Sequence, residues 1–447
     1  KRKASKLEAK KLKQQKIQEA GGKRPRPDKP ASSSSSAPKS KKKNNNKKKN
    51  KGQGQEQQHR FGRVMENAPC PNQSRMATLS LAIPGSIVSN AQTQELRTHL
   101  VGQIARALAI YHVDEIVVFN DRLGKDIRPH WNSFRRRDRE QEHGEGGSAS
   151  AGAGKPDEKD AKEQEKEDEE EKRMQPSTDP HAFMARILQY CECPQYLRRH
   201  FFPMHPDLQF GGLLAPLDAP HHVRALDRSE FREGVVMDKT GTGEGAGSLV
   251  NCGVRNQPIE IDRILAPGIR CTVQIDPRAY GTPGKSLKGK VVSPSEPRER
   301  DGTYWGYTTR MASSIKAIFD ESPFEGGYDL KIGTSERGDV SVDNESFENS
   351  YTKERQSFNH AIIVVGGVAG IEECVDADET LNLSGNDSKK LFDMWVNVCE
   401  FQGSRTIRTE EAVLISLARL RPFLFAKRNG NGKNTNNEKK LTPATVD

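Results

Sequence analysis

The residues best suited to bind a polar ligand form a turn and an acidic helix start near the C-terminal end. They span positions 402–412 and come just before an apolar helix pattern at 413–420. Thr409, Glu410 and Glu411 can accept hydrogen bonds from the free N–H groups of a first helical turn and complement their charge. A loop held by a helix in this way can offer backbone groups to a ligand. The pattern alone does not identify the ligand.

Two earlier segments have a related design. Residues 330–338 are typical of a short strand that runs into a polar loop, and residues 361–372 of a buried strand that ends in a glycine-rich turn. Glycines at strand ends, here Gly366 and Gly367, let the backbone come close to a ligand. Each glycine by itself could equally be an ordinary turn residue.

In this order and at these intervals, the three segments resemble the cofactor loops of the SPOUT class of S-adenosylmethionine-dependent RNA methyltransferases. Residues 80–87 and 116–121 also resemble one branch of that class, the eukaryotic and archaeal methyltransferases with a small inserted β-barrel. The resemblance covers about residues 76–426. It implies an α/β fold with a parallel sheet, a C-terminal trefoil knot, which is a rare exception to un-knotted topology, and a homodimer.

The resemblance also implies a cofactor site for S-adenosylmethionine. Its expected residues are Thr334, Arg337, Gly366, Gly367, Asn397, Gln402, Gly403, Ser404, Thr406 and Ile407. Residues 403–407 should contact the adenosine through the main chain, and the Asn397 amide can both donate and accept. The alternative for Arg337 is a surface arginine paired with Glu336 or Asp339.

Two residues near the same loop are candidates for catalysis. Arg405 could clamp a phosphate or polarise the target base. The Arg-Thr-Glu sequence here is similar to bacterial SPOUT enzymes that methylate N3 of a uridine in ribosomal RNA. That nitrogen carries a proton, so the chemistry needs a base or strong stabilisation of the anion. Glu410 or Glu411 could be this base, although both are also ordinary first-turn acids. Asn90 and Arg97, after the first strand, are candidates for RNA contact.

The elements that must position these residues begin with a strand at 78–83, a helix at 93–111 and a strand at 115–120. This order predicts a parallel α/β sheet. Helices are expected at 180–191, 194–200 and 313–320, and a further strand at 394–399, before the last cofactor loop. His221 and His222 are paired, but no third ligand pattern accompanies them, so no metal is expected.

Between 233 and 303 the pattern changes to five short strands with glycine and proline turns. The expected strands are 234–238, 248–254, 259–261, 270–275 and 289–292, which suit a small OB-like barrel used for RNA recognition. Arg278 and Lys288 are the chosen RNA contacts, and the other basic residues that could line the RNA path are Arg255, Arg263, Arg270, Lys285 and Lys290. The ends of this insertion, near Glu233 and Tyr304, must lie close together.

Charge is distributed unevenly along the chain. Residues 1–60 contain 21 Lys/Arg and four Asp/Glu, a net charge of +17, whereas the whole 447-residue chain carries +10, so the remainder sums to about −7. The tail is expected to be disordered and to act as a nuclear or nucleolar address or an RNA tether; a solubilising extension is the alternative. Residues 157–171 hold ten acidic residues and three lysines, which predicts a solvated insertion.

The seven cysteines lack a second zinc-spaced pair beside Cys191 and Cys193, which favours reduced structural thiols in an intracellular protein. No signal peptide or long apolar run indicates a membrane span. The expected organisation is a basic tail (1–75), a first methyltransferase segment (76–232, interrupted at 138–177), the barrel (233–303), a second methyltransferase segment (304–426) and a C-terminal tail (427–447). The favoured function is methylation of a large-subunit rRNA base, with uridine N3 preferred. The alternative is a non-catalytic RNA-binding, ribosome-assembly or chromosome-segregation scaffold.

Overall fold

The computed structural model describes most of the chain between Ser74 and Phe425. The described residues are 74–125, 127, 177–241, 246–254, 257–280, 287–344, 347 and 358–425. The predicted basic tail, nearly all of the acidic insertion and the C-terminal tail lie outside these ranges.

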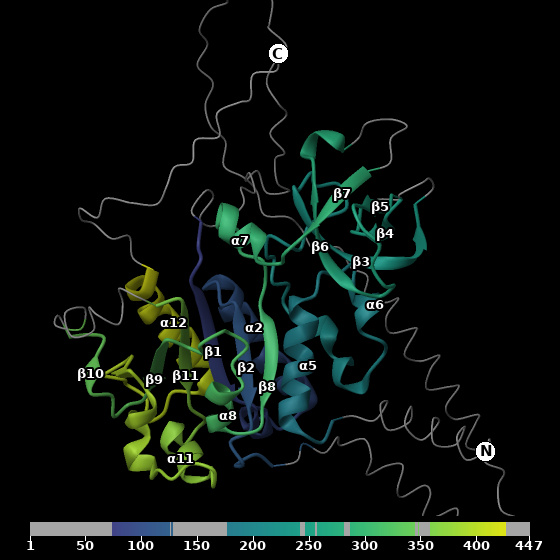
Figure 1. The fold of residues 1–447 in the computed structure, drawn as a ribbon. Helices are drawn as coiled ribbons and strands as arrows, with labels where there is room; N and C mark the ends of the chain where they lie inside the picture. Colours follow the sequence, from purple (N-terminus) through teal and green to yellow (C-terminus); the bar gives the residue numbers. More distant parts are fainter. Residues whose placement is uncertain are drawn as a thin grey trace, which may run out of the picture. The chain divides into compact units, whose positions relative to one another are not determined.

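A seven-stranded sheet forms the centre of the main domain (Figure 1), and all its strand pairs are parallel. Its order is β10-β12-β9-β11-β1-β2-β8. The strands are β1 (Thr78–Pro84), β2 (Glu115–Phe119), β8 (Thr308–Ala312), β9 (Leu330–Thr334), β10 (Val340–Ser341), β11 (His360–Val365) and β12 (Met394–Asn397). Because all strands run the same way, the three loops expected to bind the cofactor meet at one edge.

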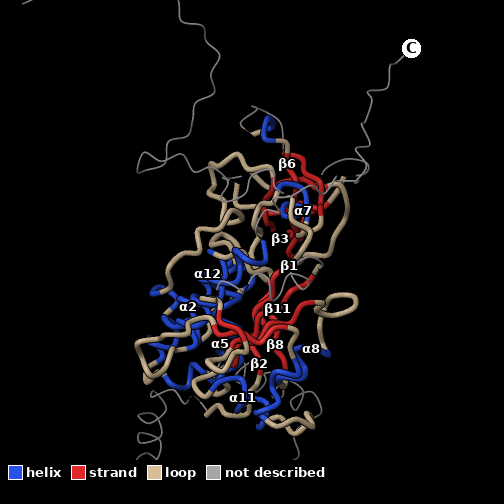
Figure 2. Tube along the Cα trace, turned by 90° about the vertical axis from the view of Figure 1, so that its left-hand side faces the viewer, coloured by secondary structure: helices blue, strands red, loops and turns tan. Residues whose placement is uncertain are grey.

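Both faces of the sheet are apolar, as a parallel sheet covered by helices requires. In β1, Leu79, Leu81 and Ile83 point into one core and Ala82 into the other. The first core is closed by α2 (Gln94–Ile110), α5 (Pro180–Glu192) and α12 (Thr409–Phe425), the second by α8 (Ile315–Asp320) and α11 (Gly370–Asp376). Figure 2 shows α2 and α12 on one side of the strands and α8 on the other.

The predicted elements agree with the observed ones apart from their ends. Thr93 is the N-cap of α2, with its hydroxyl accepting from the Leu96 N–H at 3.3 Å, and Tyr111 is the C-cap. The short helix expected at 194–200 is α6 (Arg198–Phe201). The strand expected to run to 399 ends at Asn397, because the Asn397 side chain accepts from the Cys399 N–H at 2.9 Å and turns the chain.

The segment 231–292 forms a closed five-stranded barrel of mixed pairing, inserted between α5 and the last strands of the sheet. Its strands are β3 (Phe231–Thr240), β4 (Ser248–Asn251), β5 (Ile259–Ile261), β6 (Arg270–Ile275) and β7 (Leu287–Val292). β3 starts three residues before the predicted strand, and the early residues Phe231, Arg232 and Glu233 pair with β6. Arg232 is fully buried, which a sequence reading would not expect inside a strand.

The remaining short elements are α7 (Glu296–Asp301) and the 3-10 helices η1 (Gly85–Asn90), η2 (Pro206–Leu208), η3 (Gly211–Leu213), η4 (Pro277–Ala279) and η5 (Gly385–Leu391). No helix among the described residues has the length and apolar character needed to cross a bilayer.

Candidate cofactor-binding site

A pocket of about 380 Å³ opens where the carboxyl ends of β9, β11 and β12 meet. The residues that follow these three strands, with the loop before α12 and two residues of η5, supply its walls. They are Thr334 to Arg337, Val365 to Gly370, Glu372, Glu373, Asp376, Gly385, Asn386, Asn397 to Cys399, Gln402, Arg405 to Ile407, Thr409 and Ala412. The pocket therefore unites three segments that lie far apart in the sequence.

Hydrogen bonds fix the loops of the pocket to one another. The Thr409 hydroxyl, buried at the start of α12, donates to the Gly366 carbonyl at 3.1 Å. The Ser335 hydroxyl donates to Glu372 Oε1 at 2.7 Å. Because each bond joins a loop after a strand to a helix from another part of the chain, the pocket walls are held in a defined arrangement before any ligand arrives.

Asn397 links two of these loops through its side chain. Its Nδ2 donates to the Glu336 carbonyl at 3.0 Å, while its Oδ1 accepts from the Cys399 N–H. The side chain was expected to serve the cofactor directly. In the structure it instead connects two loops of the pocket wall.

The glycines of the pocket differ in what a side chain would meet. A Cβ at Gly366 would lie 2.4 Å from the Gly370 carbonyl carbon and 2.4 Å from the Ile371 nitrogen, so only glycine fits this turn. A Cβ at Gly367 would be at ordinary contact distance, 3.5 Å, from Pro84 Cγ. A Cβ at Gly403 would meet nothing within 4 Å. The sequence predicted a close approach of backbone at Gly366, Gly367 and Gly403, and within the protein the structure shows it at Gly366.

The charged residues of the pocket wall are mostly acidic. Glu336, Glu372, Glu373 and Asp376 face two arginines, Arg337 and Arg405. A net negative wall suits a ligand that carries a positive charge, such as a sulfonium or an ammonium group. Glu372 and Glu373 come directly after the predicted glycine turn, and this position was the signal that sequence reasoning missed.

Most of the predicted cofactor residues are brought together here. Those that line the pocket are Thr334, Arg337, Gly366, Gly367, Asn397, Gln402, Thr406 and Ile407, together with the candidate Arg405. Gly403 and Ser404 belong to the same loop but are exposed outside the lining. Asp339, a possible partner of Arg337, pairs instead with Lys389 at 3.5 Å.

The acids at the start of α12 have distinct surroundings. Glu411 Oε2 accepts from the Arg408 N–H at 3.0 Å, the bond that a residue at the third helical position makes to the cap. Glu411 therefore has the helix-capping role that was the alternative to catalysis. Glu410 lies in the same turn and does not line the pocket.

The candidate RNA residues after β1 lie elsewhere. Asn90 ends η1 and is exposed. Arg97 sits in the first turn of α2, where its Nε donates to the Ala91 carbonyl at 3.0 Å and burial lowers its pKa. Neither residue lines the pocket.

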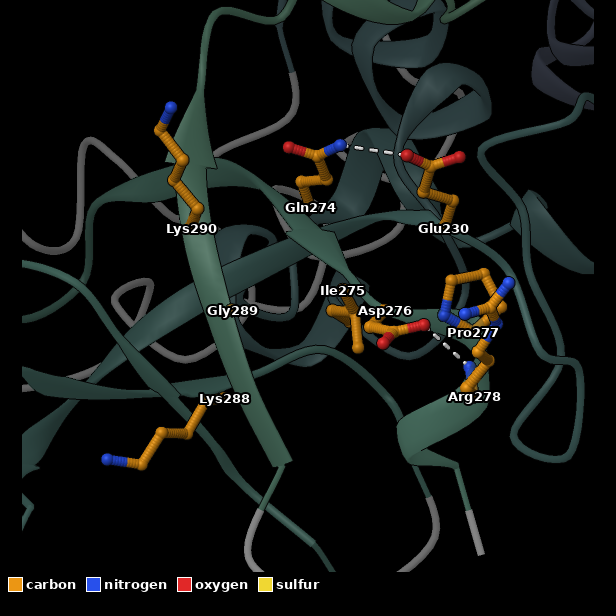
Figure 3. A pocket seen from close by; sticks show the side chains of 9 residues that line it. All are labelled: Glu230, Gln274, Ile275, Asp276, Pro277, Arg278, Lys288, Gly289 and Lys290. Atoms are coloured by element: carbon orange, nitrogen blue, oxygen red, sulfur yellow. Dashed lines mark hydrogen bonds between the residues drawn. The ribbon is translucent and has the colours of Figure 1, made fainter. Parts of the chain in front are cut away.

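The barrel has a separate open groove of about 630 Å³ (Figure 3). Arg278, Lys288 and Lys290 line it together with Gln274, Asp276 and Glu230. Lys288 and Lys290 extend from β7, and Arg278 lies across the groove from them. Lys288 is 77% exposed, with Glu260 at 3.9 Å as a distant partner. The groove thus offers accessible cations, as predicted for Arg278 and Lys288.

Arg270 does not belong to that surface. Its guanidinium forms two hydrogen bonds to the Glu192 carboxylate, at 2.7 and 2.9 Å, and one to Glu233 at 2.7 Å. It therefore ties the barrel to the end of α5, and the expectation that it lines the RNA path is wrong. Arg263 pairs with Asp262 at 3.0 Å. Arg255 and Lys285 lie outside the described residues.

The ends of the barrel insertion meet at the same junction. Trp305 Nε1 donates to Glu233 Oε1 at 2.5 Å, which confirms that the entry and exit of the insertion lie close together. His221 Nε2 is 3.1 Å from Glu192 Oε1, and the His222 ring contacts the Glu192 carbonyl at 2.7 Å. The paired histidines thus serve this junction. Among the described residues, no cluster of three or more His, Cys, Asp or Glu side chains could hold a metal ion.

A comparison with known protein families identifies one family that this chain matches. Residues 78–420 match the family described as "Putative RNA methyltransferase", and the chain belongs to that family. The match includes the sheet, the inserted barrel and every residue of the pocket wall.

The names of individual relatives specify a reaction and a substrate. A Mus musculus protein named 28S rRNA (uridine-N(3))-methyltransferase is 48% identical over 354 residues, 79% of this chain and 78% of the relative. The Homo sapiens protein of the same name is 46% identical over 355 residues, 79% of this chain and 80% of the relative. A Drosophila melanogaster protein of that name is 40% identical over 365 residues, 81% of this chain and 66% of the relative.

Proposed function

We propose that this protein transfers a methyl group from S-adenosylmethionine to N3 of a uridine in 28S rRNA. The observation that carries the proposal is the pocket at the ends of β9, β11 and β12, which three sequence-distant loops build in a chain similar to proteins named for that reaction. These relatives are 46–48% identical over 79% of the chain, and the family match over residues 78–420 includes all of these loops.

The residues present fit the proposed cofactor. A turn that admits only glycine at position 366 exposes backbone groups to a ligand, and the Thr409 bond holds this turn against the start of α12. Residues 402–407 supply further main-chain groups for the adenosine. The acidic wall suits the positively charged end of the cofactor. When bound, the cofactor supplies an electrophilic methyl group on sulfur.

The chain's own groups then have to orient the acceptor and exclude water. Arg405, which lines the pocket and is exposed, is positioned to hold a phosphate or the uracil ring of the incoming RNA. Glu410 remains a candidate base, acting from the first turn of α12. Asn90 and Arg97 remain candidates for RNA contact on the β1 side of the sheet.

We further propose that the barrel is an OB-like RNA-recognition domain, and that Arg278 and Lys288 contact the RNA backbone. The supporting observation is the groove that these residues line with Lys290. Exposed cations at this spacing would contribute affinity through phosphate contacts, which fall with rising salt.

The proposal includes three further features: a knot, an oligomeric state and a cellular location. The loop and helix at 402–425 form a trefoil knot, the active protein is a homodimer, and the +17 charge of residues 1–60 directs the protein to the nucleus and nucleolus. Imaging a fluorescent full chain and a variant lacking residues 1–60 tests the address. Equal nucleolar signal from both would contradict it.

The test of the function is a comparison of modified bases. Total RNA from cells with and without the protein is digested and analysed for methylated uridines by mass spectrometry. The proposal expects 3-methyluridine of 28S rRNA to disappear in the deficient cells and to return with the parent protein but not with a pocket variant. Unchanged 3-methyluridine would leave the non-catalytic scaffold as the better account.

A further inference from the structure

A second set of polar side chains lies beside the cofactor pocket, at the carboxyl ends of β1 and β2. These strands follow β11 in the sheet order, so their ends lie next to the glycine turn of the pocket. Asp121 follows β2, and a Cβ at Gly367 would lie 3.8 Å from Asp121 Oδ2. Gly367 itself lines the pocket. With no side chain at Gly367, the Asp121 carboxylate lies directly behind this edge of the pocket, although Asp121 is not itself a lining residue.

Asp121 is a buried carboxylate, with 3% of its surface exposed. The Ser86 hydroxyl donates to its Oδ2 at 2.5 Å, and the Leu123 N–H donates to its Oδ1 at 3.4 Å. A carboxylate removed from water in this way needs a nearby positive charge to stay ionised.

His181 is the group that can supply this charge. Its Nε2 is 3.8 Å from Asp121 Oδ1 and has no hydrogen-bond partner, although the residue is only 6% exposed. Its Nδ1 is 2.7 Å from Asp179 Oδ1, which fixes the ring. Gly85 allows the ring to pack there, because a Cβ at Gly85 would lie 2.5 Å from His181 Cδ2.

The charges around the ring favour its protonated form. Burial alone would lower the pKa of His181, but the carboxylates of Asp121 and Asp179 outweigh burial and raise it. Asp121 comes from the end of β2, Asp179 from the cap of α5, and Ser86 and Gly85 from η1. Cys374 of α11 also faces Asp121, and burial together with the Asp121 charge raises the pKa of its thiol. Arg122, the nearest cation along the chain, lies 3.8 Å from both Asp378 and Glu379.

We propose that Asp121 is the base that removes the N3 proton of the target uridine, and that His181 keeps this buried carboxylate ionised. This inference rests on the proposed function and names a catalytic residue for it. Its geometry is the Asp121 carboxylate beside Gly367 at the pocket edge, with the otherwise unpartnered Nε2 of His181 on its other side. Ser86 orients the carboxylate through its hydroxyl.

The proposed reaction takes the proton from N3 and puts the methyl group in its place. The electron pair of the N3–H bond stays on nitrogen as the proton passes to Asp121 Oδ2, and N3 forms its bond to the methyl carbon. The carbon–sulfur bond breaks with its electrons on sulfur, which becomes a neutral thioether. The proton leaves Asp121 to water after the product departs.

The experiment compares variants of the full chain on transcribed 28S rRNA fragments with labelled S-adenosylmethionine. Asp121→Asn should lower the single-turnover rate by about 10²- to 10⁴-fold, the range of a lost general base, while cofactor affinity stays within about twofold of the parent. Asp320→Asn, a matched change on an exposed residue of α8, should keep the parent rate.

A more acidic substrate separates a chemical role from a structural one. Transcripts that contain 5-fluorouridine have a more acidic N3–H and depend less on a base. The rate deficit of Asp121→Asn should therefore shrink by about tenfold or more on such RNA. An equal deficit on both RNAs, or a loss of cofactor affinity in this variant, would overturn the assignment.

His181→Gln provides a second test of the proposal if Asp121→Asn does not fold. Without the imidazolium, the Asp121 carboxylate loses the positive charge beside it. Since the reaction needs the carboxylate, the acid side of the pH–rate profile should move to higher pH. An unmoved profile would overturn the role of His181. Failure of the parent protein to methylate any fragment would instead contradict the proposed function.

Discussion

The cofactor pocket and the barrel groove are built on opposite principles. The pocket consists of backbone turns and acids, and side-chain bonds such as Thr409 to Gly366 fix its loops to one another. The groove carries Arg278, Lys288 and Lys290 on a barrel face that is open to solvent. Ligand binding in the pocket should therefore depend on the shape of its backbone turns, whereas binding in the groove should depend on the charge of its side chains. Single substitutions should therefore harm the pocket sharply and the groove gradually.

The sharpest way to break this comparison is at Gly366. Gly366→Ala places a Cβ 2.4 Å from the Gly370 carbonyl carbon, so the turn has to change shape. We expect S-adenosylmethionine affinity, measured by calorimetric titration, to fall by about 100-fold or more, equivalent to about 2.7 kcal/mol. Gly212→Ala is the matched control, since Gly212 lies in η3 outside the pocket and its Cβ would meet nothing within 4 Å. Equal affinities for the two variants would refute the account of the pocket.

Arg270 tests the junction that connects the two regions. Arg270→Ala leaves the carboxylates of Glu192 and Glu233 buried without their cation. The free energy of unfolding should drop by about 2–3 kcal/mol in urea titrations, somewhat less than for a fully buried pair because the Arg270 side chain is 32% exposed. Arg263→Ala, which removes an ion pair on the surface, should leave the free energy of unfolding unchanged within the error of the titration. A similar small cost for both would mean that the junction is not held by charge.

Removing positive charge from the barrel groove tests whether RNA binding there depends on charge. The combined change of Arg278, Lys288 and Lys290 to Ser should lower RNA affinity and reduce the slope of log affinity against log salt by about 2, roughly 0.7 for each contact with single-stranded RNA. Cofactor affinity should not change, because none of the three lines the pocket. An unaltered salt slope would remove the groove from the RNA path.

The smallest expected effect concerns one bond of the pocket. Thr409→Val keeps the shape of the side chain but removes its hydrogen bond to the Gly366 carbonyl. We expect a loss of about 0.5–1.5 kcal/mol in thermal or urea unfolding, and a few-fold weaker cofactor binding. If stability falls while binding is unchanged, the bond supports the fold without shaping the site.

The sequence predicted the sheet and the barrel well because both leave strong local patterns. Continuous apolar strands such as 361–365 and the 3.6-residue repeat of α2 are set by burial. β8 was not predicted, since its residues Thr308 to Ala312 are largely polar and become a strand only by pairing with β2. The two-residue strand β10 is likewise defined by its neighbour β12.

The sequence predicted the site only where a local motif identified it, and not where contacts between distant residues decide the arrangement. The glycine turns marked the pocket, but the sequence could not distinguish Gly366, which meets backbone, from Gly403, which meets open space. Arg270 looked like any basic residue of the barrel until its carboxylate partners, 37 and 78 positions away, were located. The proximity of Asp121 to His181 and Gly367 likewise arises from the order of the strands, which no local pattern encodes.

The most direct test of the account is methyl transfer by the purified full chain. The protein is incubated with transcribed 28S rRNA and S-adenosylmethionine that carries a deuterated methyl group, and the RNA is digested to nucleosides for mass spectrometry. The account predicts deuterated 3-methyluridine with the parent protein and its near absence with Gly366→Ala. Label on a different atom or nucleoside, or none with a parent protein that binds the cofactor, would contradict it.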